Sequence, residues 1–336
     1  MAERNTQIDS LKFFLIFLVL VGHCLDINLG LHSNNALFRF IYSFHMPVFV
    51  ILSGIMFKEK GVKKLIVGCI TLAITYLVFQ LLYGGKTLEY KGGSILGFWY
   101  QGFLYNVTHL YDPADGLWYL VSLFFWRIFL NYTPQNIKNK TILHFCLIIG
   151  ISLLAGFVPL GRIMSFQRTF AFYPLFVFGY YLKDWYVKLR SIPKLVPVAV
   201  LLLYVVLIFF TSVPPINVLL QRTPYDTANI AMSILSKGFF YAWTIPISLS
   251  VISLFPDIKL FSKEGSYTLF YYMYHMFFVL LFRYLVINTG LECDILTVFI
   301  YAFVSFATMA LLRHITVFSF LINPLSFIKK KSILNS

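Results

Sequence analysis

The first apolar segment of the chain contains a row of titratable residues, Asp9, Lys12, His23 and Asp26. Lys12 and His23 are eleven positions apart, so a helix places them on one face, about 16 Å apart along its axis. Asp9 and Asp26 extend that stripe because each lies three positions from one of these two residues. Ionisable groups in a membrane helix face a protein interior or a water-filled cavity. The stripe therefore predicts a site.

The chemistry that these residue types suggest is proton transfer. Asp26 is placed to orient His23 and fix its tautomer, which strengthens the imidazole as a general base. His45, in the next apolar segment, is a second candidate by the same argument, and Pro47 after it can kink a helix near a cavity. The alternative is structural: Lys12 reaches the membrane interface, and His23 satisfies a hydrogen bond.

The composition indicates that lipid is the solvent of this chain. Of its 336 residues 59% are hydrophobic and only 12% charged, whereas soluble domains carry about a quarter charged residues. The formal charge of +14 comes from short basic loops between apolar runs, so we expect no nucleic-acid partner. The sequence has no zinc, P-loop or dinucleotide motif, so we expect no metal.

The elements that must position these residues are about ten transmembrane helices in an all-α bundle. The apolar runs are Leu11–Leu29, Leu37–Phe57, Leu65–Tyr83, Leu117–Leu130, Ile142–Val158, Phe170–Leu182, Leu195–Val213, Ile230–Phe255, Tyr267–Ile287 and Ile295–Leu312. Some are short for a hydrocarbon core of about 30 Å, and flanking aromatic residues can extend them. Ser94–Tyr105 is too short to span and is predicted to lie at the surface or to be re-entrant.

The loop charges orient this bundle. With the N-terminus inside, the inner segments hold sixteen basic residues and the outer segments six, which fits both termini in the cytoplasm. We predict a single membrane domain over 1–336, with its core at about 7–325 and a basic cytoplasmic tail at 326–336. Lys329, Lys330 and Lys331 in that tail would meet anionic lipid.

Five groups of residues occur in an order that resembles a known family. They are Lys12 to His23, Phe44-His45-Met46-Pro47 with Leu52-Ser53-Gly54, Gly116-Leu117-Trp118-Tyr119-Leu120, Arg168 with Pro174 and Gly179, and Tyr271-Tyr272-Met273-Tyr274-His275. Together they resemble the membrane acyltransferase-3 family, particularly its fucose-4-O-acetylase-like branch, over nearly the whole chain. The resemblance implies a ten-helix core that moves an acyl group, usually acetyl from acetyl-CoA, onto extracytoplasmic sugars.

The resemblance also implies roles for individual residues. The family has an arginine where this chain has Lys12, which keeps the charge but loses the bidentate fork. Lys12 and Ser53 are then predicted to bind the acyl-CoA donor, and His23, Asp26 and His45 to be catalytic.

Four residues are predicted to bind the acceptor: Trp118, Arg168, Tyr272 and His275. Each also has a structural explanation. Trp118 fits an interfacial aromatic belt, Arg168 fits an interfacial anchor, and Tyr272 and His275 can satisfy each other by hydrogen bonds.

We therefore expect an O-acyltransferase in the cell membrane of a bacterium, with acetyl-CoA or another acyl-CoA as donor. The acceptor is a hydroxyl of a cell-surface glycan or lipid-linked sugar, and the other partner is the lipid bilayer. The rival prediction is an exporter of polysaccharide or lipid-linked sugar, because intramembrane His, Lys and Asp also form proton relays. A non-catalytic partner in glycan assembly is a third possibility. No feature indicates an oligomeric state.

Overall fold

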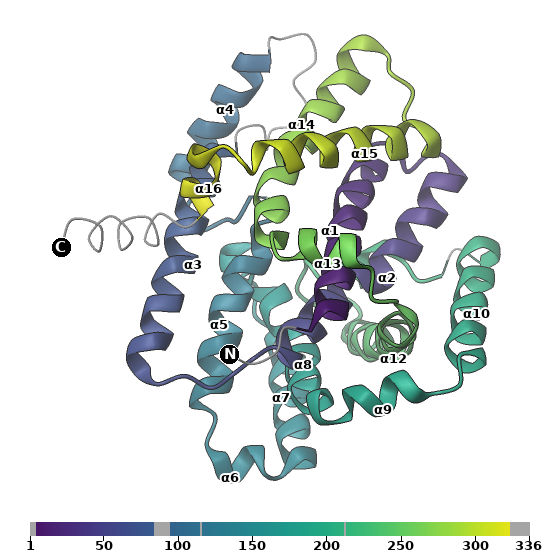
Figure 1. Cartoon of the computed structure of the whole chain (residues 1–336). Helices are drawn as coiled ribbons and strands as arrows, with labels where there is room; N and C mark the ends of the chain where they lie inside the picture. The colour runs from purple at the N-terminus through teal and green to yellow at the C-terminus, as the bar shows by residue number, and fades with distance from the viewer. Residues whose placement is uncertain (1–4, 84–94, 115, 212, 323–336) are drawn as a thin grey trace.

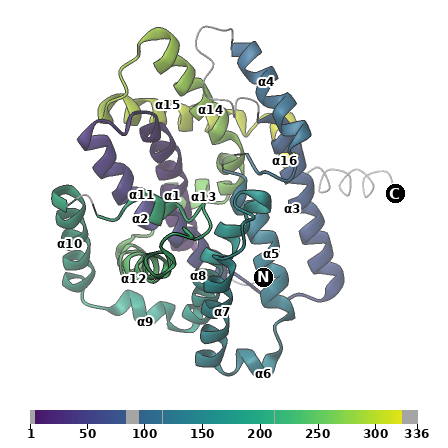
Figure 2. The ribbon, with the colours of Figure 1, turned by 180° about the vertical axis from the view of Figure 1, so that it is seen from behind.

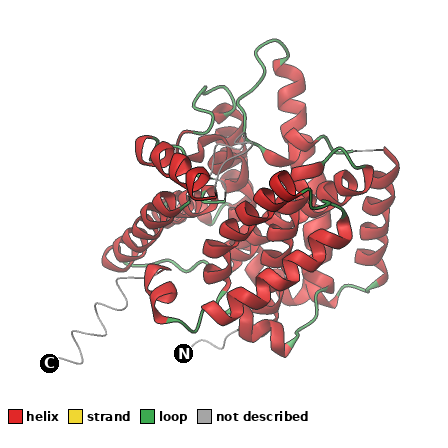
Figure 3. Cartoon of the chain, turned by 90° about the horizontal axis from the view of Figure 1, so that it is seen from above, coloured by secondary structure: helices red, strands yellow, loops and turns green. Residues whose placement is uncertain are grey.

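The computed structural model describes residues 5–83, 95–114, 116–211 and 213–322, and every regular element in these ranges is a helix (Figures 1 and 3). The longer helices are α1 (Thr6–Leu25), α2 (His32–Ile55), α3 (Val62–Leu82), α4 (Ile95–Thr108), α5 (Trp118–Tyr132), α7 (Thr141–Ala155), α8 (Phe166–Leu182), α10 (Leu195–Thr211), α12 (Ile230–Leu254), α14 (Thr268–Thr289) and α15 (Ile295–Leu312). Shorter helices connect them: η1 (Asp26–Asn28), α6 (Gln135–Lys138), η2 (Ile163–Ser165), η3 (Lys183–Trp185), α9 (Tyr186–Ser191), α11 (Ile216–Leu220), α13 (Lys259–Gly265) and α16 (Thr316–Ile322).

All ten predicted apolar runs coincide with helices, but six of these helices are long and apolar enough to cross a membrane: α1, α2, α3, α12, α14 and α15. A seventh span results if η2, α8, η3, α9 and α10 count as one broken element, which bends by 100°. The helices α5 and α7 have 15 residues each, or about 22 Å, which is less than a hydrocarbon core. The count of ten spans and the cytoplasmic termini therefore remain predictions.

The central helix of the fold is α1. It packs against α2, α13, α14 and α15, and 14 of its 20 residues are buried. Its N-terminus is capped by the Asn5 side chain, which accepts a hydrogen bond from the Ile8 amide at 3.1 Å. Since α1 is enclosed by other helices, its polar residues lie inside protein rather than in lipid.

The helices α2 and α8 are in close backbone contact. A Cβ atom on Gly54 would overlap the carbonyl oxygen of Phe176, and one on Gly179 would overlap the carbonyl oxygen of Ile51. The two backbones therefore touch, as the small residues in the sequence predict. This contact fixes α2, which carries His45 and Ser53, against α8, which carries Arg168.

Not every long helix runs along the bundle. In both Figure 1 and Figure 2, α15 runs crosswise to α3. The short helix α4 packs against α3, where the sequence predicted a segment too short to span. The predicted basic tail at 326–336 lies outside the described residues.

Candidate active site

A first cavity lies among α1, α2, α5, α8, α11 and α14. Five of the nine predicted site residues line it, namely His23, His45, Trp118, Arg168 and Tyr272, together with Tyr42, Met46 and Arg222. Its free volume is about 30 Å³, enough for one or two water molecules. We call it the histidine cavity. A larger molecule would have to widen it.

Two histidines, His45 at this cavity and His275 beside His23, are held in a defined tautomer. Nδ1 of His45 lies 2.8 Å from the carbonyl oxygen of Ile41, and Nδ1 of His275 lies 2.6 Å from that of Tyr272. A carbonyl oxygen only accepts, so each Nδ1 donates and each Nε2 keeps the lone pair that can take a proton. Nε2 of His275 is buried and has no hydrogen-bond partner among the described residues.

His23 contacts both the cavity and His275. It lines the cavity, and its ring centroid is 5.6 Å from that of His275. Asp26, which was predicted to orient His23, lies in η1 one turn further and is exposed. The structure thus brings a second histidine up to His23, a contact that the sequence did not predict.

Gly116 closes the cavity beside α14. Its φ of +93° lies in the region that favours glycine, and a Cβ atom there would lie 3.4 Å from Cε1 of His275. The hydroxyl of Tyr272 donates to the carbonyl oxygen of Gly116. This turn therefore fixes the start of α5 against the Tyr272–His275 segment.

Trp118 and Arg168 form one wall of the histidine cavity. Trp118 is buried, and the guanidinium carbon of Arg168 lies 4.8 Å from its ring centroid, a cation–π contact. Arg168 also donates from Nε to the carbonyl oxygen of Leu220 in α11 at 3.0 Å. Trp118 thus faces the cavity, whereas a belt tryptophan would face the membrane interface.

A second cavity, about 270 Å³ in volume, lies near the other end of α2. It is lined by Ser53 and by four basic side chains, Lys58, Lys60, Lys64 and Arg127, among others. We call it the basic cavity. Four cations around one space favour a ligand with several negative charges, such as a chain of phosphates.

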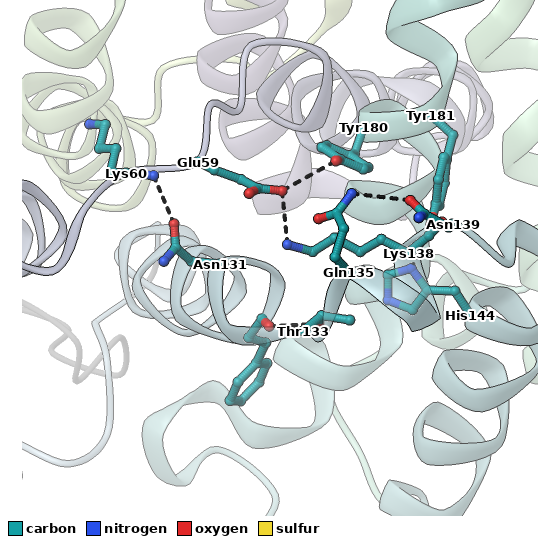
Figure 4. Close-up of polar contacts among 11 residues, drawn as sticks. Glu59, Lys60, Asn131, Thr133, Gln135, Lys138, Asn139, His144, Tyr180 and Tyr181 are labelled. Carbon is teal, nitrogen blue, oxygen red and sulfur yellow. Dashed lines mark hydrogen bonds and ion pairs between the residues drawn. The ribbon is translucent and has the colours of Figure 1, made fainter.

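The loop between α2 and α3, which carries Lys58 and Lys60, is tied to neighbouring helices (Figure 4). Lys138, which is 4% exposed, donates to Glu59 at 2.8 Å, and the side chain of Asn131 accepts from the Lys60 amide at 2.9 Å. Tyr180 also donates to Glu59 at 3.4 Å. The buried Lys138 and the end of α5 therefore position the loop before any ligand binds.

Ser53 and Tyr119 lie between the two cavities. Ser53 lines the basic cavity and shares a hydrogen bond of 2.5 Å with the hydroxyl of Tyr119. The Tyr119 ring centroid is 5.6 Å from that of Tyr272, which lines the histidine cavity. Along α2, His45 and Ser53 are about 12 Å apart. A polar and aromatic layer thus separates the two spaces.

Lys12 lies elsewhere, in the first half of α1. Its Nζ forms an ion pair with Asp9 at 2.7 Å, and both residues belong to the predicted stripe. Neither residue is among those that line the two cavities. A role for Lys12 in donor binding therefore remains a prediction.

The sequence alone did not identify every residue at the site. Arg222, Lys58, Lys60, Lys64 and Arg127 were counted only by their place in the predicted topology, and Tyr42 was not noticed. Lysine spacing in a loop has no period that indicates a shared cavity. The one available signal was the density of basic residues at 58–64.

The fold and its interior define the class of this protein. The described residues contain six apolar helices of spanning length, with histidines and cations around internal cavities, which makes the chain a multi-pass membrane protein. A family model described as an acyltransferase domain matches residues 5–314, so the chain belongs to the acyltransferase-3 family and is a membrane acyltransferase. No curated protein and no solved structure matched the chain in the corresponding searches.

Proposed function

We propose that this acyltransferase transfers an acyl group, in the first place acetyl, from acyl-CoA to a hydroxyl of an extracytoplasmic carbohydrate. The observation that supports this most is the pair of cavities separated by Ser53, Tyr119 and Tyr272. One holds the cations that suit a phosphate-rich donor, and the other holds the histidines that suit proton transfer. The fucose-4-O-acetylase-like branch, suggested by the sequence motifs, belongs to the same proposal.

The donor is proposed to bind in the basic cavity. The phosphates of CoA would be held by the four basic side chains of this cavity, Lys58, Lys60, Lys64 and Arg127. The thioester would approach Tyr119 from the side of the cavity that Ser53 lines. The loop charges predict that this end of α2 faces the cytoplasm, where acyl-CoA is made.

The reaction is proposed to occur at the histidine cavity. His23 takes the proton of the acceptor hydroxyl, the oxygen attacks the thioester carbon, and a C–O bond replaces the C–S bond. The proton then passes to the sulfur of the departing CoA. His45 and His275, each with a lone pair on Nε2, assist this transfer. Trp118, Arg168 and Tyr272 would contact the acceptor from the walls.

The direct test uses the purified full-length protein in lipid with radiolabelled acetyl-CoA and a surface polysaccharide. We expect the label to appear in the polysaccharide as a base-labile ester. Polysaccharide that crosses the membrane unmodified would instead support the exporter, and neither transfer nor transport would support a non-catalytic role.

A variant of the basic cavity tests the donor site. Replacing Lys64 with alanine is expected to raise the KM for acetyl-CoA about tenfold, because one charge-assisted contact to phosphate is lost, with kcat nearly unchanged. The matched control is Lys63→Ala, because Lys63 is also exposed and adjacent but does not line the cavity. Equal KM values for the two variants would contradict this placement of the donor.

A further inference from the structure

A third cavity, of about 300 Å³, lies beside the N-terminal part of α12. Its lining is mostly polar: three side-chain amides, two serine hydroxyls and a tyrosine ring, from Asn217, Gln221, Asn229, Ser233, Ser236 and Tyr225. This volume is at the lower end of the range for small-molecule sites. We call it the amide cavity. Nothing in the proposed chemistry uses it.

The amides of this cavity are held by their own backbone contacts. The side-chain oxygens of Asn217 and Asn229 accept from the amides of Val218 (3.0 Å) and Met232 (3.2 Å), which leaves each Nδ2 to donate. Gln221 donates from Nε2 to the carbonyl oxygen of Val218 at 2.8 Å, which leaves Oε1 to accept. The cavity therefore presents fixed donors and acceptors together.

The serine and tyrosine groups add to this set. The hydroxyl oxygen of Ser233 accepts from the Asp226 amide at 3.1 Å and keeps its own proton for donation. Tyr225 is held by a hydrogen bond of 2.8 Å from its amide to the carbonyl oxygen of Gly156, and its ring packs against Phe157 with centroids 5.0 Å apart. Burial raises the pKa of Tyr225, so this side chain stays a neutral phenol.

The charges around the amide cavity nearly cancel. Lys237 is 4% exposed, donates to the carbonyl oxygen of Ser152 at 2.9 Å and lies 4.9 Å from the Tyr225 ring centroid. Asp226 supplies one carboxylate, and its Oδ1 accepts from the Ala228 amide at 2.9 Å. One cation and one anion with many amides and hydroxyls favour a neutral, hydroxyl-rich ligand over a phosphate or an anionic headgroup.

The amide cavity shares a wall with the histidine cavity. Leu219, Leu220 and Arg222 line the histidine cavity, while Asn217 and Gln221 of the same segment line the amide cavity. The hydrogen bond from Arg168 to Leu220 holds this wall against α8, and one from Arg39 to Pro214 holds its start against α2. A chain-like ligand that widens the histidine cavity would therefore extend across this wall into both spaces.

We propose that the amide cavity binds a neutral sugar unit of the acceptor glycan, adjacent to the unit that receives the acyl group. This inference rests on the proposed function for the identity of the acceptor. Side-chain amides and hydroxyls pair with sugar hydroxyls, and an aromatic wall packs against the apolar face of a sugar ring. The enzyme then recognises an oligosaccharide rather than a single sugar.

The test fills the cavity from one helix. Ser236→Leu places a larger side chain in the amide cavity, and the matched control Gly238→Leu adds the same side chain on α12 where a Cβ atom meets open space. Binding of each purified protein is measured against a panel of neutral tri- to hexasaccharides of hexoses and deoxyhexoses. We expect Ser236→Leu to bind at least about tenfold more weakly than wild type and Gly238→Leu to bind like wild type.

A second variant and a second readout complete the test. Thr223→Val removes one lining hydroxyl without changing the size of the side chain, and about threefold weaker binding is expected. In acyl transfer, Ser236→Leu should raise the KM for an oligosaccharide about tenfold and leave the KM for a monosaccharide glycoside unchanged.

The outcomes separate this inference from the proposed function. Wild-type protein that binds no oligosaccharide, or a Ser236→Leu variant that binds as well as Gly238→Leu, would overturn the inference. Suppose instead that the wild-type protein binds an oligosaccharide, loses this binding in Ser236→Leu and yet transfers no acyl group. That result would support the sugar site in the amide cavity and refute the proposed acyl transfer. Acyl transfer that Ser236→Leu leaves unchanged for every acceptor would support the proposed function and refute the sugar site in the amide cavity.

Discussion

Replacing His23 with alanine is expected to lower the kcat of acyl transfer by a factor of about 10² to 10⁴, the usual contribution of a general base. His23 lines the histidine cavity, at the opposite side of the Ser53–Tyr119 layer from the basic cavity. The KM for acetyl-CoA should therefore change little. The measurement is transfer of labelled acetyl to surface glycan at equal amounts of folded protein.

The matched control is His32→Ala. His32 is the first residue of α2 and is exposed, so its removal leaves the histidine cavity unchanged. His275→Ala is informative too, because the ring of His275 lies next to His23 with a buried Nε2. Undiminished acetylation by the His23→Ala protein would remove His23 from the mechanism and direct attention to His45 and His275.

Replacing Gly54 with alanine is expected to destabilise the folded protein by about 3 kcal/mol or more, or to prevent folding. The added methyl group would overlap the carbonyl oxygen of Phe176, which is backbone and cannot rotate away. To accommodate it, α2 and α8 must separate along a contact that also includes Gly179. Thermal unfolding in detergent, followed by size-exclusion chromatography, measures the effect.

The control for this substitution is not expected to destabilise the folded protein. Gly68 lies in α3, and a Cβ atom there meets nothing within 4 Å. Gly68→Ala should leave the stability unchanged or raise it slightly, because alanine favours a helix by about 1 kcal/mol over glycine. If Gly54→Ala melted at the same temperature as Gly68→Ala, the α2–α8 contact described here would be wrong.

A loss of activity in Gly54→Ala would also report on the site. The helix α2 carries His45 at the histidine cavity and Ser53 at the basic cavity, while α8 carries Arg168. Separation of these helices therefore disturbs both cavities together, whereas Lys64→Ala should disturb donor binding alone. Comparing the two variants distinguishes a packing defect from a binding defect.

Several site positions could be predicted because their signals are local. A buried titratable residue in an apolar run is unusual wherever it occurs, so His23, His45 and His275 were candidates from the sequence. The structure places the first two on one cavity and the third directly behind it. The predicted partner of His23, Asp26, is exposed and lies in η1, and its role in orienting His23 stays a prediction.

The number of spans was harder to predict because hydropathy does not show how a helix is oriented relative to the rest of the bundle. The run at 195–213 forms α10, which follows a bend of 100° after α8, η3 and α9. Likewise α15 is apolar and 18 residues long, yet it runs crosswise to α3 (Figure 1). A topology that alternates between the two sides at each apolar run assumes that all of these helices lie roughly parallel. Only the way the helices pack tests that assumption.

The sequence by itself determined that lipid surrounds the chain and that the fold is all-helical. It also determined the position of each long apolar helix and which histidines lie in the interior. These properties follow from local composition, since every backbone group in lipid must bond within its own helix. Only the tertiary structure decided which distant residues share a space: Lys58, Lys60 and Lys64 with Arg127, and α11 with both Arg168 and the wall of the amide cavity. Such convergence depends on how helices pack across long separations in the chain, and no period or short motif records it.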